Sequence, residues 1–357
     1  MATIDPAYFD ENARTAPATA ERQIACIGDL ELESGNVLPN VEVAYQIFGS
    51  LNADRSNAIL VCHALSGDSN CAGWWDRLIG PRKAFDTNHY AVIGTNALGG
   101  CQGTTGPSSL SPEGRPWGSS FPAITVGDMV AAQARLLDQL GIPQLACVTG
   151  GSMGGMQALE WTRQFPTRVS RAYITAASTA HSALQIAYNE AARQAILRDP
   201  DWASGDYYPG PGPVHGLAVS RMIGHISFLS ELAFTAKFGR DRKADPDGWA
   251  PEFQVESYLN YQGDKFTKRF DANSFLVLSK AIDGYECAEL PAGPRMLFTS
   301  YSSDLLYPSH QSEAAHQLSI AAGRESAHHV IETPWGHDAF LLEAEEQTRL
   351  IRAFLSG

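Results

Sequence analysis

A serine with almost no side chains around it is the first residue of this sequence whose setting indicates chemistry. Residues 149–156 read TGGSMGGM, so Ser152 fits the pattern G-x-S-x-G, between the apolar run LACV and the helical run MQALEW. A strand–turn–helix of this kind exposes the hydroxyl at a helix N-terminus, where negative charge is favoured. Glycines are needed there because larger residues would collide with the neighbouring strand and helix. We interpret Ser152 as a nucleophile. The alternative is a glycine-rich turn of a nucleotide-binding fold, although the Gly-Lys-Ser/Thr of a P-loop is missing.

A serine nucleophile needs a base, and in this arrangement the acid and then the histidine follow the serine along the chain. His337, in WGHDAF, follows the last predicted strand and precedes the terminal helix, where the base is expected. His63 also ends a strand, but it comes before Ser152. Four further histidines lie on a helix face or within a strand, which favours a structural role: His310, His316, His328 and His329.

The acid is expected to end the strand that precedes the base. Asp304, in SYSSDLLYP, does so and could hold the imidazole of His337 in the right tautomer. A turn-forming aspartate is the alternative reading of Asp304. Asp338 competes by its position in the sequence, but adjacent side chains point apart, so we expect it to be free for substrate.

An oxyanion hole needs two backbone N–H groups. One should come from Met153, the residue after the nucleophile, and the other from the loop after an early strand. The segment HALSG at 63–67 is that loop, and Leu65 is the candidate on position alone.

Strands and helices alternate along most of the chain. Strands are predicted at 41–49, 57–65, 89–100, 144–152 and 171–178, and the sheet resumes within the segments 295–304 and 328–340. Helices are predicted at 126–141, from 153 to Pro166, and at the C-terminus. This predicts an α/β fold with a mostly parallel central sheet and helices on both faces. From about 179 to 285 the helical runs 182–197 and 216–234 indicate an inserted lid. We therefore predict a flexible N-terminus at 1–20, a core at 21–178 and 290–357, and a helical lid at 179–289.

Composition excludes several classes of protein. The 357 residues carry a formal net charge of −13, which argues against nucleic-acid binding. The polar N-terminus and the absence of long apolar runs argue against a signal peptide and a membrane span. The six cysteines form no CxxC pair, so neither zinc nor another metal is expected. A cytoplasmic protein without disulfides fits this pattern.

A family resemblance then emerges from strings in the same order, among them HALSGD, NALGGCQGTTGPSS, GGSMGGMQALEW, RMIGHIS, FQVESYLNYQGDKF, SSDLLYP and GHDAFLLE. From about residue 25 onward the chain resembles the homoserine O-acetyltransferase family. The resemblance implies an α/β-hydrolase fold with a helical lid, a homodimer, and acyl transfer from acyl-CoA to an amino-acid hydroxyl, before sulfur incorporation towards methionine. The family's catalytic residues fall on Ser152, Asp304 and His337.

The resemblance also assigns substrate contacts to Arg221 and Asp338. On residue type alone, Arg221 is interpreted as a helix arginine that snorkels to the surface or pairs locally. In the family role it clamps the homoserine carboxylate while Asp338 holds the ammonium group. The expected reaction is a ping-pong transfer with acetyl-CoA as co-substrate and no bound cofactor. Homoserine O-succinyltransferase and serine O-acetyltransferase stay open as alternatives, since SGDSNCAG at 66–73 departs from the family pattern. A carboxylesterase also stays open, since the same triad serves hydrolases.

Overall fold

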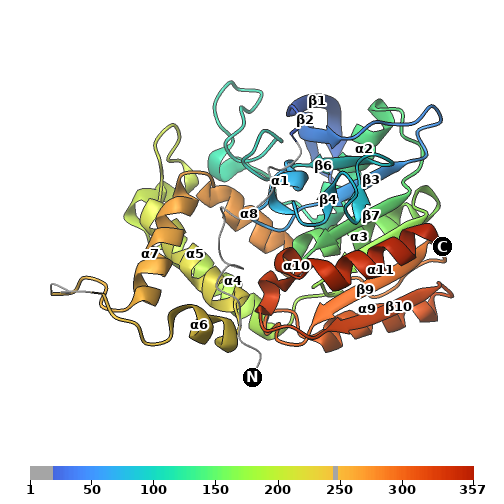
Figure 1. The fold of residues 1–357 in the computed structure, drawn as a ribbon. Helices are drawn as coiled ribbons and strands as arrows, with labels where there is room; N and C mark the ends of the chain where they lie inside the picture. Colours follow the sequence, from blue (N-terminus) through green and yellow to red (C-terminus); the bar gives the residue numbers. More distant parts are fainter. Residues whose placement is uncertain (1–18, 244–247) are drawn as a thin grey trace.

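The computed structural model describes residues 19–243 and 248–357 (Figure 1). The predicted flexible segment 1–20 lies outside the described residues, apart from Thr19 and Ala20. All six cysteines are free thiols.

One mixed sheet forms the centre of the fold. Within the described residues it has eight strands in the order β1-β2-β6-β3-β7-β8-β9-β10. The strands are β1 (Gln23–Glu31), β2 (Val37–Phe48), β3 (Ala58–Cys62), β6 (Ala91–Thr95), β7 (Cys147–Gly151), β8 (Arg171–Thr175), β9 (Arg295–Tyr301) and β10 (Ser326–Ile331). A separate pair joins β4 (Ile79–Gly80) and β5 (Phe85–Asp86). Strand β2 is antiparallel to β1 and β6, and all other neighbours are parallel, which confirms the predicted mostly parallel sheet.

Strand β1 has no counterpart among the predicted strands. Its register with β2 shifts on both sides of Gly28. These shifts break the period-two pattern of buried and exposed side chains by which a strand is recognised in a sequence.

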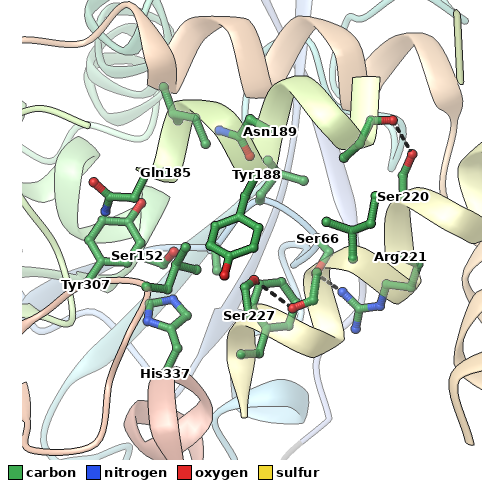
Figure 2. A pocket seen from close by; sticks show the side chains of 18 of the residues that line it. Ser66, Ser152, Gln185, Tyr188, Asn189, Ser220, Arg221, Ser227, Tyr307 and His337 are labelled. Carbon is green, nitrogen blue, oxygen red and sulfur yellow. Dashed lines mark hydrogen bonds between the residues drawn. The ribbon is translucent and has the colours of Figure 1, made fainter. Parts of the chain in front are cut away.

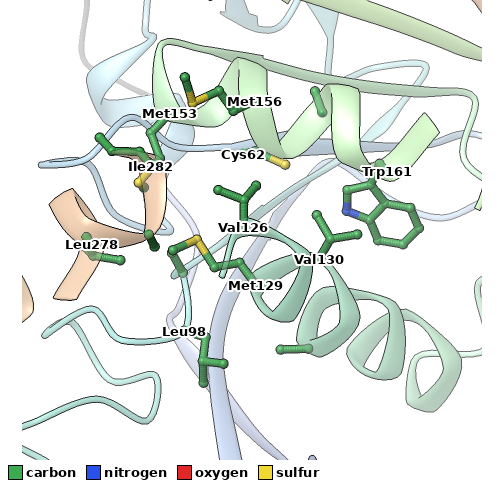
Figure 3. Packing of buried hydrophobic residues seen from close by; sticks show 14 of the residues in the cluster. Cys62, Leu98, Val126, Met129, Val130, Met153, Met156, Trp161, Leu278 and Ile282 are labelled. Carbon is green, nitrogen blue, oxygen red and sulfur yellow. The ribbon is translucent and has the colours of Figure 1, made fainter. Parts of the chain in front are cut away.

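Helices cover both faces of the sheet because successive side chains of a strand point to opposite faces. Leu60 and Cys62 of β3 belong to one hydrophobic cluster, whereas Ile59 and Val61 belong to a second. The first cluster is completed by α2 (Val126–Gln139) and α3 (Met153–Gln164), and Figure 3 shows their methionine and valine side chains around Cys62. The second cluster is closed by α1 (Cys71–Trp74), α10 (Ala339–Leu342) and α11 (Ala344–Ser356). Helix α9 (Ser309–Ala321) packs against β9 and β10.

Between β8 and β9 the described chain is helical. The helices are α4 (Ala183–Leu197), α5 (Val214–Phe228), α6 (Glu231–Phe238), α7 (Gln254–Thr267) and α8 (Ala272–Asp283). They lie together at one side of the sheet (Figure 1), and α8 contributes Leu278 and Ile282 to the first cluster. The boundaries of the predicted lid, 179–289, stay a prediction. Short 3₁₀ turns complete the fold: η3 (Gly118–Ser120), η4 (Pro166–Arg168), η5 (Pro200–Gly205) and η6 (Gly336–Asp338).

The predicted helical run 216–234 is two helices rather than one. Helix α5 ends at Phe228, and α6 begins after Ser230, whose hydroxyl oxygen accepts a hydrogen bond from the N–H of Ala233 at 3.0 Å. The same hydroxyl donates to the carbonyl of Pro334, so the break is attached to the segment that leads into η6. An N-capping serine followed by glutamate is the signal in the sequence that marks this start.

Among the described residues, no single helix has the length and apolar character to cross a membrane. Helices α5 and α6 together meet these criteria of length and composition. The two helix axes are bent by 106° at the break between them.

Candidate active site

Ser152 lies at the turn between β7 and α3 in a backbone conformation that few residues adopt. Its φ is 57° and its ψ is −127°, outside the regions that non-glycine residues prefer. Such strain costs on the order of 1–3 kcal/mol and persists only where the surroundings enforce it. Here the N–H of Ser152 points at the carbonyls of Thr175 and Ala176, each at 3.2 Å, which ties the turn to the end of β8.

The glycines around Ser152 are required by close backbone packing. A Cβ atom on Gly150 would lie 2.6 Å from the carbonyl oxygen of Cys62 and would also collide with the backbone of Gly154. A Cβ on Gly154 would collide with the carbonyl of Cys62, and one on Gly151 would lie 2.6 Å from the ring of Phe340. The collisions inferred from the sequence are therefore present.

Asp304 and His337 form a buried pair. Oδ2 of Asp304 lies 2.8 Å from Nδ1 of His337, and the two side chains are 0% and 4% exposed. The other carboxylate oxygen, Oδ1, accepts hydrogen bonds from the N–H groups of Leu306 and Tyr307 at 2.9 and 2.8 Å. Asp304 therefore has both of the roles considered for it: Oδ1 orders the turn, and Oδ2 faces the imidazole of His337.

The parallel strands bring these groups to one edge of the sheet, since Ser152 follows β7, Asp304 follows β9 and His337 follows β10. Ser152 and His337 line the same pocket, of about 210 Å³, with Arg221 (Figure 2). Leu65 and Asp338 also line this pocket. Asp304 lies behind His337, and Met153 begins α3 as a fully buried residue.

Leu65 lies in the loop after β3, and the adjacent His63 organises that loop. The N–H of Ala97 donates to Nε2 of His63 at 2.9 Å, so the other nitrogen, Nδ1, donates to the carbonyl of Ala64 at 2.7 Å. Burial lowers the pKa of His63, which favours this neutral ring. Both of its nitrogens are occupied, so His63 has a structural role beside Leu65.

The remaining histidines weighed as bases lie away from the pocket. His328 contacts the hydroxyl of Ser300 at 2.8 Å and the carboxylate of Glu313 at 2.7 Å, and His316 contacts the hydroxyl of Ser326 at 2.7 Å. His310 belongs to α9 and His329 to β10.

Arg221 projects from α5 into the pocket. Its guanidinium donates to the hydroxyl of Ser66 at 3.2 Å and lies 4.9 Å from the ring centre of Phe266. Burial lowers the pKa of Arg221 to about 10, although Asp338 opposes this. No carboxylate among the described residues forms an ion pair with this guanidinium, so the local pairing expected from residue type alone is not observed.

Asp338 follows His337 directly, in η6. Burial raises the pKa of this carboxyl, while His337 and Arg221 pull it down. The pocket that Ser152 and His337 line is therefore also lined by the guanidinium of Arg221 and the carboxyl group of Asp338. In the described residues no group of three or more histidine, cysteine, aspartate or glutamate side chains could hold a metal ion.

Two residues that line the pocket, Tyr307 and His181, are not predicted from the sequence. The ring of Tyr307 stacks on that of His337, with centres 4.9 Å apart at 20°, and its phenol contacts Nε2 of His181 at 2.7 Å. Tyr307 lies three residues after the predicted acid, in SSDLLYP, and this position could have indicated that it lies near the site. Nothing in the local sequence marks His181.

The sheet order, the strained serine turn and the buried Asp304–His337 pair define a protein of the α/β-hydrolase fold, and the family model described as alpha/beta hydrolase fold matches residues 57–344. Homoserine O-acetyltransferase from Solidesulfovibrio magneticus is 49% identical over 352 residues, which cover 91% of this chain and 89% of that protein. The chain belongs to the homoserine O-acetyltransferase family.

Solved structures agree with this fold. The crystal structure of homoserine O-acetyltransferase from Bacillus anthracis matches with a TM-score of 0.87 at 27% identity, covering 95% of this chain and 98% of that chain. Esterase E22 matches with a TM-score of 0.86 at 28% identity, covering 94% of this chain and all (100%) of that chain. The fold alone therefore does not separate transferases from esterases.

Proposed function

We propose that this protein transfers the acetyl group of acetyl-CoA to the hydroxyl of L-homoserine, giving O-acetyl-L-homoserine and CoA. The observation that carries the proposal is the pair of opposite charges beside Ser152 and His337. Arg221 forms no ion pair with a carboxylate of the described residues and suits the carboxylate of an amino acid, whereas Asp338 suits its ammonium group. An amino acid held between them would present its own hydroxyl to His337.

The chemistry takes two half-reactions through one acyl-enzyme. His337, oriented by Asp304, accepts the proton of Ser152 as the serine oxygen attacks the thioester carbonyl. The N–H groups of Met153 and Leu65 stabilise the oxyanion, the C–S bond breaks, and CoA leaves with the proton. His337 then accepts the proton of the homoserine hydroxyl, whose oxygen attacks the ester carbon, and Ser152 leaves with that proton.

The charge in the pocket favours acetyl over succinyl as the donor's acyl group. Among the described residues that line the pocket, Arg221 is the only one that carries a guanidinium or ammonium group. A succinyl group adds a second carboxylate, which would be buried without a partner once Arg221 holds the amino acid.

Three further features belong to the proposal. The catalytic groups are all side chains or backbone of this chain, so acetyl-CoA acts as a co-substrate and no cofactor is bound. Free thiols at all six cysteines suit a reducing compartment, and we place the protein in the cytoplasm. We also propose a homodimer, because lid helices expose apolar side chains at Val219, Ile226, Leu232 and Tyr261.

The deciding experiment measures CoA release from acetyl-CoA or succinyl-CoA, with homoserine, serine or no acceptor, and determines the mass of the product. The proposal requires release that depends on homoserine and yields acetyl-homoserine. Release that ignores amino acids and yields free acetate would instead indicate an esterase, the activity named for the structural neighbour E22.

Arg221→Ala tests the amino-acid clamp. Loss of a buried carboxylate partner costs at least about 2 kcal/mol, so the KM for homoserine should rise about 30-fold or more, with a much smaller change for acetyl-CoA. Arg198→Ala, at an exposed arginine beyond α4, is the matched control. Equal changes in the two KM values would contradict the clamp.

A further inference from the structure

His181, which lines the pocket, belongs to a second carboxylate–imidazole pair, contributed by the lid. Oδ1 of Asp283, the last residue of α8, lies 2.8 Å from Nδ1 of His181. The side chains of His181 and Asp283 are 3% and 10% exposed, so the contact is buried. On the far side of the imidazole, Nε2 lies 2.7 Å from the phenol oxygen of Tyr307.

Tyr307 connects this second pair to Ser152. Its backbone N–H is held by Asp304, and its ring is stacked on His337. Burial raises the pKa of Tyr307, and the nearby side chain of Ser152 opposes that rise. Figure 2 shows Tyr307 beside Ser152 and above His337. The phenol oxygen thus stands between the nucleophile and the imidazole of His181.

The polarity of this chain of hydrogen bonds is set at Asp283. Its carboxylate accepts from His181, from Nδ2 of Asn189 at 2.7 Å and from Nη1 of Arg193 at 2.6 Å. Burial alone would raise the pKa of Asp283, but these three donors outweigh it and hold the pKa below its ordinary value. An ionised carboxylate only accepts, so Nδ1 of His181 carries a proton.

The direction of the phenol hydrogen follows from that tautomer. If the ring carries only that proton, Nε2 is an acceptor. The hydroxyl of Tyr307 then donates to His181, and only its lone pairs face Ser152. A phenol that donated to Ser152 would instead occupy the lone pair with which the serine attacks.

We propose that His181 carries only its Nδ1 proton and that Asp283 and His181 are positioning residues. They direct the hydrogen of the Tyr307 hydroxyl towards His181 and away from Ser152, so that the phenol does not donate to the nucleophile and the Ser152 proton is left to His337. The inference rests on the proposed role of Ser152 as the nucleophile. It is independent of which amino acid takes the acyl group.

A double-mutant cycle tests the proposal. In Asp283→Asn the amide oxygen can keep Arg193 while the amide nitrogen donates to Nδ1 of His181. The imidazole then donates from Nε2, and the phenol hydrogen turns to Ser152. Tyr307→Phe removes the phenol, so a misdirected hydrogen no longer exists. The readout is the rate of the nitrophenol burst from p-nitrophenyl acetate in both single variants, the double variant and the unchanged protein.

The proposal expects Asp283→Asn to slow the burst about tenfold or more when Tyr307 is present, the effect of one misplaced hydrogen bond. In the Tyr307→Phe background the same substitution should slow it less than about twofold, since the route to Ser152 is cut. An equal loss in both backgrounds, or no loss when Tyr307 is present, would overturn the proposal. If Asp283→Asn does not fold, His181→Ala takes its place, because it also frees the phenol hydrogen.

Arg193→Lys is the matched control for the lid. It disturbs the same carboxylate but leaves His181 in the same tautomer, so its effect on the burst should be equal in both Tyr307 backgrounds. If Arg193→Lys slowed the burst as much as Asp283→Asn does, and only when Tyr307 is present, a change in lid packing would be enough to slow the reaction of Ser152. That result would overturn the proposal.

Failure of the proposed function is distinguishable from failure of this inference. Nitrophenyl acetate needs no amino-acid acceptor, so absence of homoserine transfer in the unchanged protein would refute the function and leave the cycle interpretable. A burst retained in Ser152→Ala would refute the nucleophile and overturn the inference with it.

Discussion

Asp304 shows how one residue can satisfy two readings of a sequence. A turn aspartate and the acid of a catalytic triad follow a strand in the same way, so the sequence leaves them as alternatives. The structure assigns Oδ1 to the N–H groups of Leu306 and Tyr307, and Oδ2 to His337. The turn that Oδ1 orders is what brings Tyr307 against the imidazole, so the two roles depend on each other.

Asp304→Asn separates these roles. The amide oxygen can keep the two backbone hydrogen bonds, while the amide nitrogen faces Nδ1 of His337 and forces the wrong tautomer. Turnover should fall by about 10⁴-fold, as the logic of the triad requires, with little loss of stability. The measurement is the rate of CoA release with homoserine, beside a thermal melt. Activity within tenfold of the unchanged protein would point to another acid, with Asp338 as the first to examine.

The residues that the sequence reveals are those whose neighbours in the chain mark them. Ser152 is marked by its glycines, and His337 and Asp304 by the ends of strands. Tyr307 and His181 contact each other across 126 positions of sequence. Tyr307 lies in SSDLLYP, but nothing in the local sequence pairs it with His181. Their pairing depends on how the lid packs onto the sheet, which no local spacing encodes.

At the scale of elements, buried runs bounded by turn residues predict β3, β6, β7, β8 and β9 well, because each strand is covered on both faces. The same rule misses β1, which is an edge strand with an irregular register. The apolar pattern also predicts α5 and α6 as one helix, because apolar residues continue across the break between them. Only the N-cap at Ser230 marks that break.

The turn between β7 and α3 is the element on which the site depends most. A methyl group at Gly154 would press on the carbonyl of Cys62 at the end of β3. Gly154→Ala should therefore lower the free energy of unfolding by about 2 kcal/mol or more and displace Ser152. Urea denaturation and the nitrophenol burst would measure both effects.

Gly284→Ala is the control for that substitution. A Cβ at Gly284 meets only ordinary contacts, the nearest at 3.5 Å from the carbonyl of Lys280. Its effect on stability should stay within about 0.5 kcal/mol. Similar losses for the two variants would show that crowding at Gly154 is not what excludes a side chain there.

At the scale of the molecule, sheet and lid share one hydrophobic cluster. Leu60 of β3 belongs to it together with Phe275, Leu278 and Ile282 of α8. The pocket lies where lid and sheet meet, which explains why it takes Ser152 from one and Arg221 from the other. The sequence predicts that a helical block is inserted, but the contacts that seat it join residues far apart in the chain and are visible only in the structure.

The seated lid also buries a histidine that makes the whole fold sensitive to acid. His225 on α5 is 6% exposed, and Nδ1 contacts the phenol of Tyr258 at 3.0 Å. Burial lowers the pKa of His225 to about 3, with further lowering by Arg221 and Lys237. Between pH 6.5 and 3 the unfolded chain therefore binds a proton that the native protein does not. The stability linked to His225 is complete above about pH 6.5 and is lost as the pH falls towards 3.

His225→Gln tests this linkage, because its amide oxygen can still accept from Tyr258 but does not titrate. Between pH 6 and 4.5 the free energy of unfolding of the unchanged protein should fall more steeply than that of the variant, by about 1.4 kcal/mol per pH unit. His89→Gln, at a histidine whose side chain is 76% exposed, should keep the steep dependence. Urea titrations at several pH values give the slopes, and parallel lines for the unchanged protein and His225→Gln would show that acid reaches the fold through other groups.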